Sequence, residues 1–337
     1  MPPKYAKVDA QKPDRATLGA AARLLRDGAL VVFPTETVYG LGASATNDEA
    51  VARVFAVKER PRNNPLIVHV ARIAQAQALA EGWSDDVDRL AHAFWPGPLT
   101  LVVPRSRRVS DLVTGGVDSV AIRIPAHPVA RELLILAAIP IVAPSANRYQ
   151  RVSPTTAQHV IDDLGDRVDL ILDGGPTPLG IESTVVSLLA DGPRVLRMGS
   201  ISAEEIATVV PDVQWAPVRD DAPIVEPDVK RSPGQVRRHY APRARIELVG
   251  QIQSMFIDGG ETVGWLVRGA EPGEKRLGST LVIVLPDDAA RYAAALYAAL
   301  HRFDAEGCTR VLVEKLPADP RWDAVRDRLM RASMPPE

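Results

Sequence analysis

Short apolar runs alternate with helical segments along the first two thirds of the chain, and polar side chains follow most of the runs. Runs rich in valine, isoleucine and leucine have the length and composition of buried strands at 29–33, 66–70, 99–103, 119–124 and 141–143. The helical segments between them begin after capping residues such as Asp14 and Asn47. This alternation predicts an α/β domain with a large sheet of mixed strand directions.

The first of these runs leads into the segment FPTETVYGLG at 33–42. Pro34 is expected to stop the strand, because proline cannot donate to a ladder of hydrogen bonds. The threonines and glutamate at 35–37 would then stand at the carboxyl end of the strand, where ligands of α/β sheets collect. Gly40 and Gly42 are expected to let the backbone turn sharply and approach another group. The segment predicts one wall of a pocket for a small polar molecule, and an ordinary strand-to-helix turn is the alternative.

The overall composition is that of a globular protein, with 46% hydrophobic and 24% charged residues among 337. A net charge of -2 argues against broad binding of nucleic acid by the whole surface. Cys308 is the only cysteine, which excludes internal disulfides and cysteine-rich metal clusters. The N-terminus lacks the apolar core of a signal peptide, and no apolar run approaches the ~20 residues of a membrane span. We therefore expect a soluble, cytoplasmic protein with no membrane association.

Polar side chains recur at or near the ends of the predicted strands. A single one is commonly a cap, but hydroxyl, imidazole and guanidinium groups on six strands favour a polar cavity. These residues are Thr35, Thr37, His69, Ser119, Arg123, Ser145, Asn147, Ser183, Thr184 and Arg197.

A basic loop at 58–64 lies close to these strands in sequence and carries Lys58, Arg60 and Arg62. Such cations suit phosphate oxygens, although a solvated surface loop has the same composition. A polyphosphate clamp would be completed by Arg197 and by the cations of a later segment, Lys230, Arg231, Arg237 and Arg238.

Several familiar catalytic motifs are missing. Residues 40–45 match the loose dinucleotide pattern G-x-G-x-x-A, but the turn and the later acidic strand end that this fingerprint needs are absent. The six histidines are dispersed, so we expect no metal site built from protein ligands. Nothing marks a covalent nucleophile. An enzyme of this sequence would work by positioning its substrates and stabilising charge.

The chain changes character after residue 212. Residues 213–244 are rich in proline and charge and read as a linker, although RSPGQVRRHYAP at 231–242 is too specific in composition for a neutral spacer. Predicted strands and helices resume at 245. We therefore predict a first domain over 1–212, a linker over 213–244 and a small α/β domain over 245–337.

Taken together, these segments resemble the threonylcarbamoyl-AMP synthase family, the YrdC-like enzymes, in its long two-domain form. The resemblance covers about residues 15–210 in order, and the linker resembles the long form specifically. It implies a YrdC-like domain with a large twisted mixed sheet, a linker that forms a lid over the active site, and a smaller Rossmann-like C-terminal domain. The matching segments are FPTETVYGL (33–41), KERP and PLIVH (58–69), WPGPLT (95–100), AIRIP (121–125), PSAN and SPT (144–155), STVV (183–186), RVLRMG (194–199) and SPGQVRRHYAP (232–242).

The resemblance implies a nucleotidyltransferase, L-threonylcarbamoyladenylate synthase. L-threonine, bicarbonate or carbon dioxide, and ATP with Mg²⁺ would give threonylcarbamoyl-AMP and pyrophosphate. The product would serve a tRNA-modifying transferase complex that acts on the adenosine beside the anticodon, and direct binding of tRNA is expected to be weak. The carbamate is unstable in water and must attack the α-phosphate, so the reaction needs confinement and neutralised phosphate charge.

The resemblance also implies roles for individual residues. The threonine side would consist of Thr37, His69, Arg123, Ala143 and Ser183, with Arg123 on the carboxylate. The nucleotide side would consist of Arg60, Asn64, Ser119, Ser145, Ser153 and Arg197, with Lys58 and Arg60 as catalytic groups at the phosphates and Tyr240 of the linker as a cover.

Two departures from the family pattern bear on these roles. Tyr149 and Gln150 stand where the family often has Ser-Gly, and Ser187 stands where it commonly has aspartate. An alternative function is a factor that binds double-stranded RNA or ribosomes with the same concave surface, which the low net charge disfavours. A carbamoyltransferase of the hydrogenase-maturation type shares the core but needs cysteine-rich zinc motifs, which a single cysteine excludes.

Overall fold

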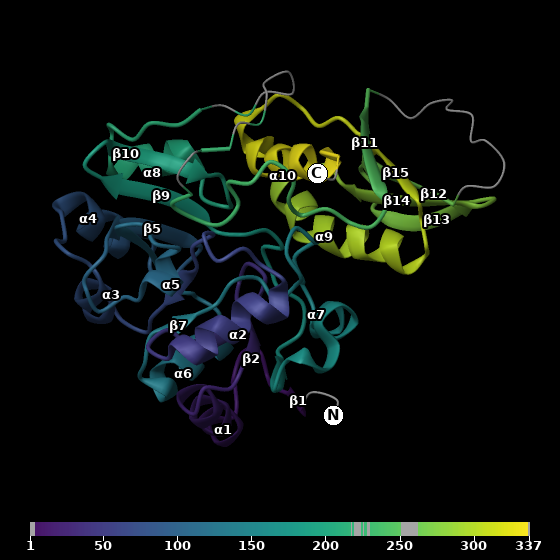
Figure 1. Cartoon of the computed structure of the whole chain (residues 1–337). Coiled ribbons are helices and arrows are strands. Elements are labelled where there is room, and N and C mark those ends of the chain that lie inside the picture. The colour runs from purple at the N-terminus through teal and green to yellow at the C-terminus, as the bar shows by residue number, and fades with distance from the viewer. Residues whose placement is uncertain are drawn as a thin grey trace.

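The computed structural model describes residues 4–216, 218, 224, 226–227, 230–250 and 262–335. These residues form a larger N-terminal body and a smaller C-terminal body, each with its own sheet (Figure 1). The predicted α/β fold, a large mixed sheet with a second smaller sheet, is confirmed. None of the helices in the described part of the chain is both long and apolar enough to cross a membrane.

The larger sheet contains ten strands within the described residues: β1 (Lys4–Lys7), β2 (Val31–Pro34), β3 (Tyr39–Ser44), β4 (Ile67–His69), β5 (Leu99–Pro104), β6 (Ser119–Arg123), β7 (Ile141–Val142), β8 (Leu170–Asp173), β9 (Thr184–Leu189) and β10 (Gly192–Arg197). Their order is β1-β8-β2-β3-β7-β4-β6-β5-β9-β10. Parallel pairs such as β4–β6 stand beside antiparallel pairs such as β5–β6, so the strand directions are mixed.

Helices cover this sheet, and their capping residues fit the sequence. Asp14 accepts a hydrogen bond from the amide of Thr17, and Asn47 accepts one from the amide of Ala50. The helices are α1 (Arg15–Arg26), α2 (Asp48–Lys58), α3 (Ile73–Leu79), α4 (Asp85–Phe94), α5 (Asp111–Thr114), α6 (Pro128–Ala137), α7 (Ala157–Leu164) and α8 (Ala203–Val209), with a short 3-10 turn at Gly165–Arg167.

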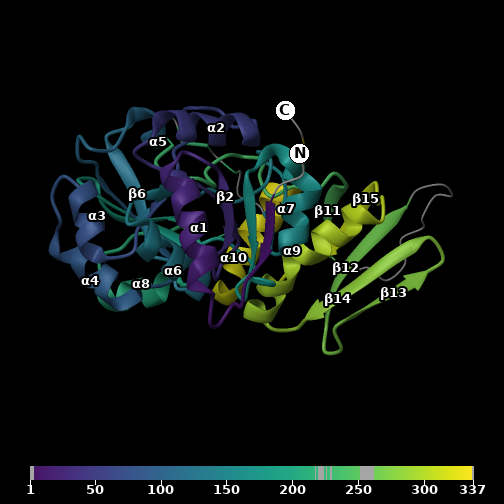
Figure 2. The ribbon, with the colours of Figure 1, turned by 90° about the horizontal axis from the view of Figure 1, so that it is seen from below.

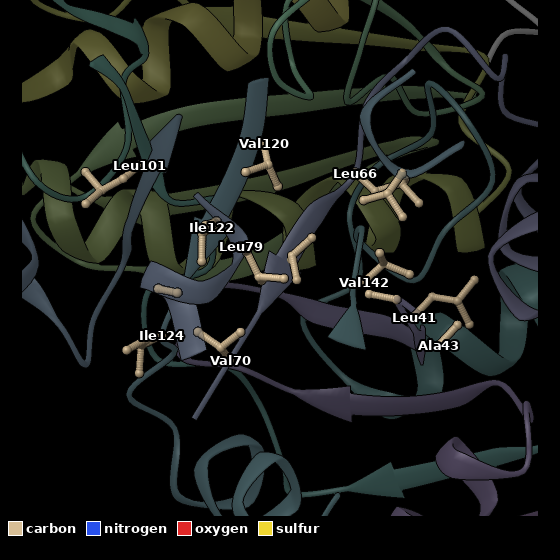
Figure 3. Close-up of a cluster of buried hydrophobic side chains, with 14 of the residues drawn as sticks. Leu41, Ala43, Leu66, Val70, Leu79, Leu101, Val120, Ile122, Ile124 and Val142 are labelled. Carbon is tan, nitrogen blue, oxygen red and sulfur yellow. The ribbon is translucent and has the colours of Figure 1, made fainter. Parts of the chain in front are cut away.

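The core lies on both faces of the sheet. Val32 packs into one apolar cluster, whereas Val31 and Phe33 pack into another. Burial on both faces explains why the strands read as continuous apolar runs rather than alternating ones. Figure 3 shows part of the first cluster, which includes side chains from β3, β5, β6 and β7 and Leu79 of α3.

The smaller sheet consists of β11 (Arg245–Val249), β12 (Val263–Gly269), β13 (Gly273–Leu277), β14 (Thr280–Pro286) and β15 (Arg310–Glu314), in the order β11-β15-β12-β14-β13. Its pairs are parallel except for β13 with β14. Helices α9 (Ala289–Ala305) and α10 (Asp323–Ser333) follow, the latter after a 3-10 turn at Pro320–Trp322. Figures 1 and 2 place both helices on the side of this sheet that faces the larger body.

The segment at 33–42 is a hairpin rather than a strand followed by a turn. Pro34 is the last residue of β2 and lies opposite Tyr39 of β3, so the expectation that the strand stops at Pro34 is confirmed. On its other side β2 pairs with β8 only at Val31 and Val32, so the missing N–H of Pro34 removes no bond to β8.

The expectation that Gly40 and Gly42 turn the backbone is wrong, because both lie inside β3. Their expected close approach to another group does occur. A Cβ on Gly42 would lie 2.7 Å from Cε1 of Phe33 and 2.8 Å from the carbonyl oxygen of Val31, and one on Gly40 would lie 3.2 Å from Cβ of Ala143. Glycine is needed here for the space that a side chain would fill.

Replacing Gly42 by alanine should therefore destabilise the protein by about 1–3 kcal/mol, because the new methyl group meets a ring and a backbone oxygen that cannot both move. The same change at Gly273, where an added Cβ has no atom within 4 Å, should shift the stability by less than about 0.5 kcal/mol. Urea unfolding of the two variants measures the difference. Equal stability would show that the β2–β3 hairpin can adjust to a side chain.

Candidate active site

The carboxyl end of β6 gathers three polar groups from distant parts of the sequence. Arg123 donates from Nη1 to Oγ1 of Thr37 (2.9 Å) and from Nη2 to Oε1 of Glu36 (2.6 Å), and its Nε donates to the carbonyl of Gly97 (3.2 Å). Thr37 is fixed in turn by a hydrogen bond between its hydroxyl and that of Thr35 (2.8 Å). Three of the five N–H groups of Arg123 are thus engaged, which leaves two for an incoming carboxylate.

Glu36 holds the guanidinium of Arg123 in place. Its other oxygen, Oε2, accepts hydrogen bonds from the amides of Ala126 (3.0 Å) and His127 (3.3 Å). Burial alone would raise the pKa of Glu36, but the charge and hydrogen bond of Arg123 outweigh it and lower this pKa. The carboxylate therefore stays ionised, and the buried pair is fully hydrogen-bonded.

His69 lies directly opposite Arg123 in the β4–β6 pairing. Burial, together with the nearby charge of Arg123, lowers the pKa of His69 to about 3. The imidazole is therefore neutral at ordinary pH, and its Nδ1 has no hydrogen-bond partner among the described residues. Ala143 follows β7 close by, with its amide bonded to the carbonyl of Ile67 (3.1 Å).

Ser183 connects this group to the linker. Its hydroxyl shares a hydrogen bond with that of Thr100 (2.7 Å) and accepts one from Nη2 of Arg197 (3.1 Å). Arg197 also donates to the carbonyl of Ser183, and its Nη1 donates to the carbonyl of Pro233 in the linker (3.3 Å). One guanidinium thus binds a strand end of the larger body and the linker together.

The predicted nucleotide side is built on the loop after α2. Arg60 donates to Oδ1 of Asn64 (2.6 Å) and lies over the ring of Tyr149, 5.9 Å from its centroid. Lys58 does not project freely, because its Nζ donates to the carbonyls of Ser145 and Asn147. Burial lowers the pKa of Lys58 well below its usual value and that of Arg60 to about 10.

Ser119 and Ser153 complete the predicted nucleotide ligands. Ser119 stands at the opposite end of β6 from Arg123, about 13 Å away by the rise of a strand. Ser153 donates its hydroxyl to Oε1 of Glu182 (2.6 Å), one residue before Ser183. The parallel β4–β6 pairing sets Ile67 opposite Ala121, so Ser119 at the start of β6 lies beside Pro65 at the end of the loop. Ser153 lies instead beside Glu182.

The linker packs against the nucleotide side of this site through His239 and Tyr240. Tyr240 is 1% exposed and adopts φ +61°, a left-handed conformation that is uncommon for an aromatic residue. Its ring lies 4.0 Å from that of His239, measured between centroids. Burial, with the charges of Arg60, Lys58 and Arg197, lowers the pKa of His239 well below its usual value. A neutral histidine thus stands among cations.

The expected clamp by the linker cations is wrong for the conformation described. Lys230 pairs with Glu226, Arg231 pairs with Asp191, Arg238 donates to the carbonyl of Met334, and Arg237 is exposed. These four side chains project from one side of the linker, and His239 and Tyr240 project from the other side. The cations around His239 come from other segments.

The structure shows what surrounds the residues at the two departures from the family pattern. The amide of Tyr149 donates to the carbonyl of Lys58 (2.7 Å), and the carbonyl of Gln150 accepts the amide of Ala241 in the linker (2.9 Å). This pair therefore helps to dock the linker. Ser187 is buried in β9, and its hydroxyl has no partner in the described part of the chain.

The predicted polar cavity is closed in this conformation. The residues assigned to it are buried, apart from Ser145, which is partly buried. Arg123 and Arg197 are both nearly inaccessible to water, and Arg197 is in direct contact with the linker.

Sequence reasoning missed several residues that complete the site. Glu36 carries only a general polar signal in the sequence, and Glu182 could be found only from its position directly before Ser183-Thr184. Tyr297 and Arg328, which bind Glu182 from α9 and α10, carry no local signal.

Two family models match the chain. The model for Sua5, YciO and YrdC proteins, described as "Telomere recombination", matches residues 23–199, and that described as "Threonylcarbamoyl-AMP synthase, C-terminal domain" matches residues 201–334. The threonylcarbamoyl-AMP synthase of Pyrococcus abyssi is 39% identical over 93% of both chains. That of Bacillus subtilis is 39% identical over 94% of this chain and 92% of its own.

A solved structure agrees with these matches. The crystal structure of P. abyssi Sua5 complexed with L-threonine superposes with a TM-score of 0.88 and 37% identity, over 98% of this chain and 97% of that one. A variant of that protein, with a histidine and the following tyrosine replaced by alanine, gives a TM-score of 0.87, 36% identity and coverage of 98% and 96%.

Replacing Glu36 by alanine should cost about 3–5 kcal/mol, because it leaves the guanidinium of Arg123 buried without its carboxylate. Glu274 provides a matched control, since it pairs with Arg302 at 2.9 Å but both side chains are about 40% exposed. Its replacement by alanine should cost at most about 1 kcal/mol. Urea denaturation measures both losses, and similar values would show that burial does not govern the strength of the Glu36–Arg123 pair.

Proposed function

Because the chain belongs to the threonylcarbamoyl-AMP synthase family, we propose that it condenses L-threonine, bicarbonate or carbon dioxide, and ATP to threonylcarbamoyl-AMP with release of pyrophosphate. The resemblance drawn from the motifs agrees with the family matches over both bodies. The observation that carries the proposal is the hydrogen bond of 2.9 Å between Arg123 and Thr37, which joins two motifs 86 positions apart.

The threonine side would bind the amino acid by its charges. The two remaining N–H groups of Arg123 would take the carboxylate, and Glu36 keeps the guanidinium oriented toward it. The neutral imidazole of His69 has a free acceptor or donor at Nδ1, which suits the amine or its carbamate. Thr37 and Ser183 would supply hydroxyls, and Ala143 would limit the space for the side chain.

The nucleotide side would neutralise the phosphates. Arg60, Arg197 and Lys58 lie near one another around His239, and a triphosphate would balance their charge. The carbamate oxygen would attack the α-phosphorus and pyrophosphate would leave, with no covalent bond to the protein. Lys58 would first have to release the carbonyls of Ser145 and Asn147 to reach an oxygen.

Magnesium has no ready set of protein ligands here. No group of three or more histidine, cysteine, aspartate or glutamate side chains in the described ranges could hold a metal ion. The two carboxylates nearest the site, Glu36 and Glu182, are paired with arginines. We propose that Mg²⁺ enters on the triphosphate, whose oxygens would be its ligands together with water.

The linker would act as a lid. The ring of Tyr240 packs against those of His239 and Tyr297, and Arg197 and Gln150 bind the linker backbone. Closure would exclude water from a carbamate that water destroys. We propose the division into a catalytic domain (1–212), a linker (213–244) and a C-terminal domain (245–337) on this basis.

The product would pass to a transferase complex that modifies the tRNA adenosine beside the anticodon. The reactive mixed anhydride favours transfer soon after release, so we propose that this partner is present in the same compartment, the cytoplasm. Direct contact with tRNA would be weak.

Purified protein should release pyrophosphate from ATP only when both L-threonine and bicarbonate are present. Replacing Arg123 by alanine should weaken threonine binding at least about 100-fold, because charge-assisted hydrogen bonds contribute roughly 1.5–3 kcal/mol each. A coupled pyrophosphate assay and calorimetric titration with threonine measure these effects.

Arg167→Ala serves as the control, since Arg167 pairs with Glu59 on the surface and should leave both measurements unchanged. Equal pyrophosphate release without threonine would contradict the proposed function.

Replacing Tyr240 by alanine should lower kcat roughly 10- to 100-fold, since a lid that is displaced by about 1 Å no longer aligns the reactants. The melting temperature of the larger body should change little. Tyr5→Ala, at an exposed position of the edge strand β1, is the matched control. Full activity of the Tyr240 variant would rule out the lid.

A further inference from the structure

The C-terminal body reaches the candidate active site through Arg328, one of the largest side chains that are fully buried in the described residues. Arg328 lies on α10, and its Nε donates to Oε2 of Glu182 (2.8 Å). Its Nη2 donates to the carbonyl of Met198 (2.8 Å), and its Nη1 pairs with Asp327 (2.7 Å). One side chain of the second body is thus anchored at three points, two of them in the first.

Glu182 connects Arg328 to the nucleotide side of the site. Its Oε1 accepts the hydroxyl of Ser153 (2.6 Å), and its Oε2 also accepts the hydroxyl of Tyr297 from α9 (2.9 Å). The residue after Glu182 is Ser183, whose hydroxyl and carbonyl are held by Arg197. A change at Glu182 would therefore move both serines that are assigned to substrates.

Arg328 also supports the lid from below. Its guanidinium carbon lies 4.8 Å from the centroid of the Tyr240 ring, and the ring of Tyr297 stacks on Tyr240 with centroids 6.0 Å apart. The same helix binds the linker backbone, because Nη1 of Arg331 donates to the carbonyl of Val236 (2.6 Å). Helix α10 therefore supports the linker in its closed position.

A buried ion pair of this kind is a poor device for stability alone. The attraction between the two charges barely offsets the free energy that is lost when both are removed from water. Apolar residues of similar volume often stabilise a protein as well or better. What the pair supplies is geometry and charge balance. Without Arg328, the carboxylate of Glu182 would stand unpaired beside the region proposed for the triphosphate and would repel it.

We propose that Arg328 is a positioning residue for the synthase reaction, which acts on the nucleotide through Glu182 and Tyr240. The C-terminal body thereby contributes to catalysis without touching the reacting atoms. The inference rests on the proposed function, since it takes the nucleotide to bind beside Ser153 and Tyr240.

The charged and titratable groups that face Glu182 determine how its pKa should change when Arg328 is replaced. They are Arg328 with its partner Asp327 on α10, Tyr297 on α9, Arg197 on β10 and Tyr240 in the linker. Burial alone would raise the pKa of Glu182, but Arg328 and Arg197 outweigh it and lower this pKa. Loss of Arg328 should therefore raise the pKa, so that Glu182 takes up a proton more readily as the pH falls.

The test compares Arg328→Met, the double variant Glu182→Gln/Arg328→Met, and Arg326→Met. Arg326 is a matched control, because it is also buried on α10 and pairs with Asp323, on the same helix. For each protein, kcat and the KM for ATP are measured between pH 6 and pH 9, and the affinity for a non-hydrolysable ATP analogue is measured by calorimetry.

Arg328→Met should raise the KM for ATP roughly 10-fold at pH 8, which is the effect of one unpaired charge over about 10 Å. The KM should move toward the wild-type value as the pH falls, because protonation removes the charge of Glu182, and the double variant should restore it at every pH. The kcat should remain low in both variants, because Tyr240 has lost its support. Arg326→Met should change neither quantity.

The proposal is overturned if Arg328→Met matches Arg326→Met in KM, kcat and analogue affinity throughout the pH range. If Arg328→Met does not fold, Arg328→Lys takes its place: the charge is kept but the fork is lost, so kcat should fall while the KM for ATP stays near wild type. Wild-type kinetics in that variant overturn the proposal. Pyrophosphate release by the wild type without threonine would instead overturn the function, and the analogue affinities would still decide the charge effect.

Discussion

The structure depends on the burial of positive charge. Lys58, Arg60, Arg123, Arg197 and Arg328 are all nearly inaccessible to water. A buried cation is tolerated only when oxygens surround it, and the chain supplies these oxygens in two ways. Arg123 and Arg328 each receive a buried carboxylate, whereas Lys58, Arg60 and Arg197 receive mainly carbonyls. In the described part of the chain none of those three forms a direct ion pair with a carboxylate, and a triphosphate would neutralise their charge.

The same constraint explains why the linker is docked rather than free. Its carbonyl at Pro233 serves Arg197, its carbonyl at Val236 serves Arg331, and its neutral His239 occupies the space among the cations. The phosphates of a nucleotide would balance the charge of these cations better than the neutral imidazole of His239 does. Under the proposed function, binding and lid movement would therefore be coupled by charge, and the contacts with α10 would give the linker a defined position to which it can return.

Local patterns in the sequence predicted the elements well, because they depend on neighbouring residues. The caps at Asp14 and Asn47 were found in this way, as was the strand that carries His69. The hairpin at 33–42 was misread, since the fit of Gly42 depends on Phe33 across a strand pair. The direction of the linker cations was misread for a similar reason: which face of an irregular segment turns inward depends on what it meets.

The sequence by itself determined the fold class, the family and the residue types of the site. Each motif is a short run of neighbouring residues, so it can be recognised without knowing the fold. Only the tertiary structure decided how these residues are paired. Glu36 meets Arg123 across 87 positions, and Glu182 meets Arg328 across 146. A carboxylate and a guanidinium attract each other in the same way wherever they stand in the chain, so no local pattern names the partner. The sheet order and the packing of α10 against the larger body select it.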